Sequence, residues 1–211
     1  MKYSLAILFV YVYSFSQELS PKEVLENVRT KYSQMNDVSA DFVQSVKLRY
    51  KQSGQKTDGT IQLKKGNRYR IETDQQTIVT DGKKVWMYSP SNKQVLIDVF
   101  KQNRQQFSPD KFLTGLPKDF SASKLDTANG FLVLSLEPTK TAVVSSMMTE
   151  VKVWVNKGSW IVEKIEYSDK NGTVTTIAIS NIRFNKGIAD TNFQFEITPE
   201  MKVVDVNSFK Q

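Results

Sequence analysis

The sequence predicts a mainly β fold with a few helices, built around one curled antiparallel sheet. Apolar and polar residues alternate along many short segments, as they do in half-buried strands. Gly, Pro, Asn and Asp fall between those segments, where tight turns need them. The chain has 211 residues, including 12 Phe and 8 Tyr, so it is long enough for one well-filled core of aromatic and β-branched strand residues.

One amphipathic helix precedes the sheet. Ser20 can cap its start, Pro21 suits the first helical position, and Glu23 completes a capping box. The apolar residues that follow at helical spacing are Val24, Leu25, Val28, Tyr32 and Met35. The helix should therefore run for about fifteen residues and end at Asn36-Asp37.

From residue 38 the apolar period changes to two, which predicts strands. Six strands up to residue 99 are joined by tight turns and read as a meander. A second short helix is expected over residues 108–115, and strands then return, the last of them over Phe193–Ile197. The total of about eleven strands is too large for a flat sheet. We therefore expect the sheet to curl, with the two helices covering its concave face.

Residues 1–16 have the pattern of a secretory signal peptide. Lys2 supplies a positive end, residues 5–13 form an apolar run, and Ser14-Phe15-Ser16 offers small residues for cleavage. The apolar run is too short for a stable membrane anchor. Residues 17–211 are then expected to form a single soluble domain after export.

The composition excludes several kinds of chemistry. The chain has no Cys and no His, so it can form no disulfide and no lipid-modified cysteine. Ser-His-Asp and Cys-His catalysis and histidine-based zinc sites are excluded as well. The acidic residues are scattered at turns and strand ends, which disfavours a carboxylate-based hydrolase. We expect a protein that is not an enzyme and that needs no metal or cofactor.

The net charge of +7 has two interpretations. The predicted export signal argues against nucleic acid as a partner. Lys47, Arg49 and Lys51 alternate with apolar residues, as on the wet side of a strand. This basic surface is either simply solvated or faces anionic membranes or an acidic partner.

Several segments, in order, carry a resemblance to a known family. They are Val38–Gln44, Gly59–Lys65, Arg68–Ile71, the Asp81-Gly82-Lys83 segment up to Pro90, and Phe193-Gln194-Phe195 before Pro199. Together they resemble the periplasmic outer-membrane lipoprotein carrier family (LolA-like). Asp-Gly-Lys alone is a common hairpin turn, so the ordered set carries the resemblance.

The resemblance implies an unclosed antiparallel β-barrel with a helical lid over an apolar cavity that takes acyl chains. Acylated lipoproteins would be collected from an inner-membrane ABC lipoprotein-release complex and handed to an outer-membrane acceptor. The carrier would be a monomer in the periplasm of a diderm bacterium. The candidate lipid-binding residues are Ile61, Leu63, Tyr69, Ile71, Trp86, Met87 and Tyr88. The candidate lid contacts are Val24, Leu25, Val28, Phe112, Leu113 and Leu116.

Each of these apolar residues also has an ordinary interpretation as core, because any sheet needs one apolar face. Alternation alone leaves open which residues of the Trp86–Tyr88 run point inward. A periplasmic lipid- or lipoprotein-sensing regulatory domain of the same fold, without shuttling, is an alternative function. A structural surface protein is disfavoured by the absence of repeats and anchors.

Lys65 is a candidate latch. Alternation places it on the apolar, odd-numbered face of the second strand, beside Ile61 and Leu63. The family typically has Arg followed by Pro here, and that Arg bonds lid carbonyls. Lys65-Gly66 implies a latch with fewer simultaneous hydrogen bonds, because Lys lacks the rigid fork of Arg. The alternative is a strand-end Lys that extends into solvent.

Overall fold

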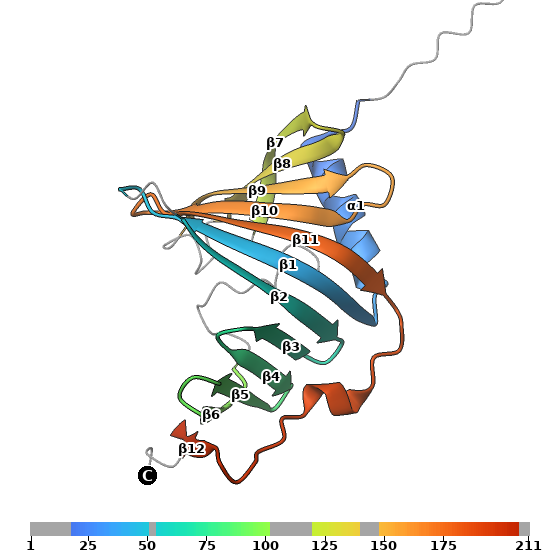
Figure 1. Ribbon diagram of the computed structural model, residues 1–211. Coiled ribbons are helices and arrows are strands. Elements are labelled where there is room, and N and C mark those ends of the chain that lie inside the picture. Colours follow the sequence, from blue (N-terminus) through green and yellow to red (C-terminus); the bar gives the residue numbers. More distant parts are fainter. Residues whose placement is uncertain (1–17, 51–53, 102–119, 140–147, 207–211) are drawn as a thin grey trace, which may run out of the picture.

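The computed structural model describes residues 18–50, 54–101, 120–139 and 148–206. In this part of the chain a single twelve-stranded sheet is accompanied by one α-helix and a short 3-10 helix (Figure 1). The predicted signal peptide and the second predicted helix lie outside the described residues. No helix among the described residues is both long and apolar enough to cross a bilayer.

Helix α1 spans Pro21–Ser33, and its start agrees with the sequence prediction. The Ser20 hydroxyl accepts the backbone N–H of Glu23 at 3.2 Å, and the Glu23 carboxylate accepts the backbone N–H of Ser20 at 2.8 Å. This reciprocal capping box satisfies two backbone donors that the first turn would otherwise leave unpaired. The first turn of α1 is therefore stabilised by local hydrogen bonds that do not involve the sheet.

The strands follow one another with short connections over most of the sheet. Their bounds are β1 Asp37–Lys47, β2 Gln55–Lys64, β3 Arg68–Thr73, β4 Thr77–Asp81, β5 Lys84–Ser89, β6 Gln94–Val99, β7 Phe120–Ala128, β8 Phe131–Pro138, β9 Met148–Asn156, β10 Val162–Asp169, β11 Val174–Phe184 and β12 Lys202–Asp205. The spatial order is β12-β6-β5-β4-β3-β2-β1-β11-β10-β9-β8-β7. Strands β12 and β7 are the two edges and do not pair with each other in the described residues, so the curved sheet is unclosed.

The cross-strand register separates the sheet into two faces. We call the inner face the one that carries Ile61, which lies opposite Ala40 on β1 and Ile71 on β3. Helix α1 packs on this face, against β7 and β8, and its buried residues join the principal core there. The outer face alternates with it and carries polar residues such as Gln62 and Arg70.

The end of the chain differs from the prediction. Residues 193–197 were expected to form a strand, but Phe193 ends the 3-10 helix η2 (Asp190–Phe193) and the next four residues pair with no strand in the described part of the chain. The last strand is β12, and it runs parallel to β6, so the sheet is not wholly antiparallel. The alternation that suggested a strand has another cause: Phe193 is fully buried and Phe195 packs on the ring of Tyr88, while Gln194 and Glu196 face solvent.

Candidate functional site

The inner face brings together most of the predicted acyl-binding residues. Ile61, Leu63 and Ile71 lie there and belong to the principal core, with exposed fractions of 1%, 4% and 7%. Tyr69 pairs with Leu63 across β2 and β3 and is partly buried against the same core. The apolar stripe of α1, formed by Val24, Leu25 and Val28, belongs to this core as well.

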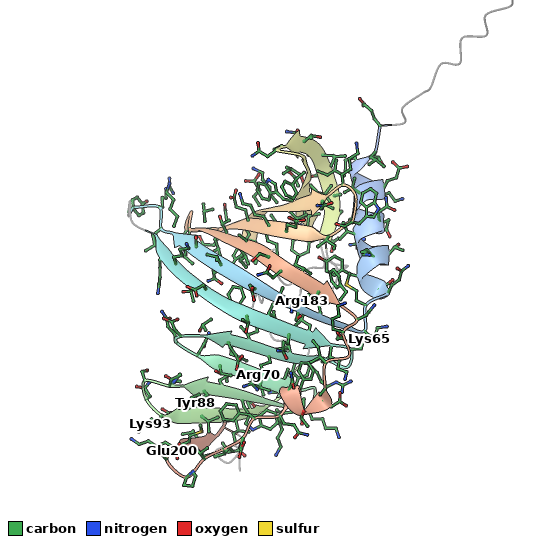
Figure 2. All side chains as sticks on the ribbon, turned by 45° about the vertical axis from the view of Figure 1, so that its right-hand side comes forward. Lys65, Arg70, Tyr88, Lys93, Arg183 and Glu200 are labelled. Carbon is green, nitrogen blue, oxygen red and sulfur yellow. The ribbon has the colours of Figure 1, made fainter. Side chains whose placement is uncertain are left out.

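The register of β5 separates the three residues of the Trp86–Tyr88 run. Met87 pairs with Ile78, which pairs with Ile71, so Met87 lies on the inner face. Trp86 pairs with Val79, which pairs with Arg70, and therefore lies on the outer face. Tyr88, labelled in Figure 2, lies on the outer face too. Its ring centroid is 5.6 Å from that of Phe195. The structure thus brings Met87, but not Trp86 or Tyr88, together with the predicted inner-face residues.

Lys65 occupies an exposed turn rather than a position on the apolar face. Strand β2 ends at Lys64, and the chain then turns at Gly66, whose φ of 90° is readily available to glycine (Figure 2). The backbone of Lys65 is well held: its N–H donates to the carbonyl of Asn36 at 2.9 Å, and its carbonyl accepts from the Arg68 guanidinium. The latch role of its side chain stays a prediction. The candidate lid residues Phe112, Leu113 and Leu116 lie outside the described residues.

Hydrogen bonds of Tyr32 and Arg29 attach α1 to the sheet, and the periodicity of the helix did not reveal them. The Tyr32 hydroxyl accepts the backbone N–H of Val162 at 3.1 Å, and Arg29 donates to the carbonyl of Phe120 at 2.8 Å. Burial raises the pKa of Tyr32 to about 12 and outweighs the opposite effect of that hydrogen bond. The ring of Tyr32 also meets Phe184 edge to face, with centroids 6.2 Å apart. Both polar attachments lie in the second half of the helix.

A cluster on the outer face holds the segment after β11. Lys64 donates to the carbonyl of Ile188 and forms an ion pair with Asp190 at 2.5 Å, and Arg68 reaches the same carboxylate at 2.7 Å. The hydrogen bond from Lys64, supported by Arg68, lowers the pKa of Asp190 below its usual range. The sequence analysis did not single out Lys64, because its partner Asp190 lies 126 positions away.

A pocket of about 250 Å³ lies on the polar side of the sheet, between β1, β2 and β11. Its polar lining residues are Ser39, Asp41, Thr60, Gln62, Asn181 and Arg183. Ala40 and Ile61 complete the lining, and the Asn181 amide donates to the Asp41 carboxylate at 2.6 Å. The polar groups suit water and polar ligands rather than hydrocarbon, so we do not assign acyl chains to this pocket. The described residues contain no group of three acidic side chains arranged for a metal ion.

Comparison with known proteins agrees with this architecture. The family model described as "Outer membrane lipoprotein carrier protein LolA" matches residues 33–196. An outer-membrane lipoprotein carrier protein of Haemophilus influenzae is 26% identical over 190 residues, which is 89% of each chain. A protein of the same description from Coxiella burnetii is 23% identical and covers 97% of this chain and 98% of its own.

Two further similarities concern proteins whose names give no function. An uncharacterized protein of Methanocaldococcus jannaschii is 28% identical over 94% of this chain, and the chain spans only 59% of that relative. The crystal structure of an uncharacterized conserved protein from Thermus thermophilus superposes with a TM-score of 0.56 at 13% identity, covering 87% of this chain and 97% of that one. The latter similarity shows the fold alone.

Proposed function

This chain belongs to the LolA family of outer membrane lipoprotein carrier proteins, and on that premise we propose that it holds the acyl chains of lipoproteins between α1 and the inner face of its sheet. It would shuttle them through the periplasm from the inner to the outer membrane. The cargo would come from an inner-membrane ABC lipoprotein-release complex and pass to an outer-membrane acceptor. Residues 1–16 would be the signal peptide that exports it.

The observation that carries this proposal is the way the first half of α1 is held. Val24, Leu25 and Val28 are buried in the principal core with Ile61 and Leu63 of the sheet. Apolar packing is not directional, so an acyl chain can replace these contacts without leaving a buried polar group unpaired. The hydrogen bonds to Phe120 and Val162 come from Arg29 and Tyr32, which lie in the second half of the helix.

The energetics require such a site. Exposing an acyl chain to water costs about 0.8 kcal/mol per methylene, so a sixteen-carbon chain costs on the order of ten kcal/mol. Free diffusion between two membranes is negligible at that cost. A carrier must therefore offer acyl chains an apolar surface nearly as favourable as a bilayer. The sheet must also be unclosed, so that the chains can enter.

The two faces of β5 allow a direct test. A photoreactive benzoylphenylalanine is placed at Met87, on the inner face, or at its neighbour Trp86, on the outer face; both side chains are partly exposed. The protein is incubated with a biotinylated triacyl peptide and irradiated. We expect labelling from position 87 and little from position 86. Equal labelling at both positions, or labelling only at 86, would contradict the proposed site.

Lys65 remains the proposed latch. Its side chain is exposed, and as a Lys it would hold the lid with fewer hydrogen bonds than the Arg of the family pattern. Closing the lid would displace cargo from the apolar site, so Lys65→Leu, which cannot latch the lid, should retain more bound lipoprotein after incubation with outer-membrane acceptor than the wild type does. Lys83→Leu, in the exposed β4–β5 turn, is the control. If Lys65→Leu retains no more lipoprotein than the wild type, Lys65 is not a latch.

A further inference from the structure

The tip where β1 passes into β2 exposes two large apolar side chains. Tyr50 is 89% exposed and Leu48 is 42% exposed, the former being the most exposed of the large apolar residues in the described structure. Neither takes part in the principal core. These two large apolar side chains, separated by one residue, are thus exposed together at one end of the sheet.

The turn between β10 and β11 lies against the same tip (Figure 1). A Cβ atom added at Gly172 in that turn would come within 2.9 Å of Cδ of Arg49, so the stem of Arg49 rests directly on it. The Arg49 guanidinium in turn lies 5.7 Å from the centroid of the Tyr50 ring. We call this surface the basic tip; its cations are Lys47, Arg49, Lys56 and Lys170.

All four cations of the basic tip are exposed. In the part of the chain that the structure describes, none of them forms an ion pair with a carboxylate. The acids near this end of the sheet are Asp58, Asp169 and Glu150, and Glu150 lies opposite Ser168 and forms an ion pair with Lys152. The four cations of the basic tip outnumber these acids, so the tip carries a net positive charge around a Tyr and a Leu.

We propose that the basic tip docks on the surface of a bilayer that contains anionic phospholipid, with the Tyr50 ring at the headgroup level and the cations on the phosphates. Tyr is favoured at membrane–water interfaces because its ring is apolar and its hydroxyl is polar. Lys and Arg near an anionic bilayer are attracted by its negative surface potential. Charge and apolar exposure at one tip thus point to the same partner. This goes beyond acyl-chain binding, which uses the inner face.

Vesicle flotation tests the charges. The full mature chain is mixed with vesicles of phosphatidylcholine alone or of phosphatidylcholine with phosphatidylglycerol. We expect the wild type to bind only the vesicles that contain phosphatidylglycerol. In the Lys47→Gln/Lys56→Gln double variant, the affinity for these vesicles should fall about fivefold for each cation removed. The matched control is Lys83→Gln/Lys84→Gln, which removes two exposed cations where the β4–β5 turn passes into β5. Equal loss in both double variants, binding to neutral vesicles, or no binding at all overturns the proposal.

The orientation is tested separately. The chain has no Cys, so a single cysteine can carry an environment-sensitive fluorophore. Leu48→Cys places it in the basic tip and Val203→Cys places it on edge strand β12, where the native side chain is similarly exposed. Anionic vesicles should shift the emission to the blue only at position 48. A shift at 203, or none at 48, contradicts docking through this tip. The Lys47→Gln/Lys56→Gln variant should bind the triacyl peptide as the wild type does. A loss of vesicle binding with unchanged peptide binding separates this proposal from the carrier function.

Discussion

The hydroxyl of Tyr32 on α1 accepts the backbone N–H of Val162, the first residue of β10, at a distance of 3.1 Å. Both residues are buried, with exposed fractions of 4% and 0%. A buried N–H group without a partner is costly, so this one bond fixes where the end of the helix meets the sheet. It lets the second half of α1 act as an anchor, while the first half contacts the rest of the described structure through apolar packing alone.

Tyr32→Phe should therefore destabilise the fold by about 1–3 kcal/mol, because it leaves the Val162 N–H unsatisfied. Urea unfolding at neutral pH measures this difference. Leu125→Ala is a comparison variant, because it removes apolar volume from a partly buried position of β7 and removes no hydrogen bond. If Tyr32→Phe is as stable as the wild type, the hydroxyl does not anchor the helix.

The same pair predicts an alkaline limit to stability. Burial raises the pKa of Tyr32 to about 12 from 10.0, so the unfolded chain loses this proton at lower pH than the folded chain does. The wild type should lose stability as pH rises from 10 towards 12. Tyr32→Phe cannot ionise there, so the stability gap between the two proteins should narrow over that range. A gap that stays constant would contradict the assigned pKa direction.

Asp190 gives the opposite dependence at acid pH. Lys64 and Arg68 lower its pKa below 3.8, so its ion pairs stabilise the fold above that value and are lost as pH falls through the lowered pKa. Asp190→Asn should be less stable than the wild type at neutral pH and equal to it in strong acid. Because the carboxylate is largely exposed, added salt should also reduce the difference. Thermal unfolding across pH and salt checks both effects.

Ser20→Ala should cost about 1 kcal/mol, because the first turn of α1 loses the hydroxyl that accepts the Glu23 N–H. Ser33→Ala, at the other end of the helix, removes a hydroxyl that only donates to the carbonyl of Thr30 and should cost less. Equal effects in denaturant unfolding would mean that the capping box does not stabilise this helix.

Gly59 on β2 is enclosed by its neighbours. An added Cβ would lie 2.2 Å from the carbonyl oxygen of Glu72 and 2.9 Å from the Phe42 ring. Gly59→Ala should therefore destabilise the sheet by about 1–3 kcal/mol through overpacking. Gly158→Ala is the control, because its nearest contact would be the Asn156 side chain at 3.6 Å. Denaturation midpoints of the two variants give the comparison.

The local features of the fold could be predicted from the sequence. The Ser20-Pro21 helix start and the alternating strands up to β11 depend on neighbouring residues, and the structure confirms them. Features that depend on distant residues could not be predicted. The ion pairs of Lys64 with Asp190 and the parallel pairing of β12 with β6 join segments more than a hundred residues apart.

The candidate site shows the same division. Alternation correctly placed Ile61, Leu63 and Ile71 on one face, but the facing of Met87 depends on the register of β5 against β4. Lys65 was expected on that face as well, and the chain turns one residue too early for it. The inner face is thus a property of strand pairing as much as of the residues on each strand.

Native mass spectrometry of the purified mature chain with a synthetic triacyl peptide shows whether the protein binds acyl chains. The unacylated peptide of the same sequence serves as the control. We predict a one-to-one complex with the triacyl peptide and none with the unacylated one. The absence of a complex with the triacyl peptide, or equal complexes with both, would contradict the proposal that this protein carries acyl chains.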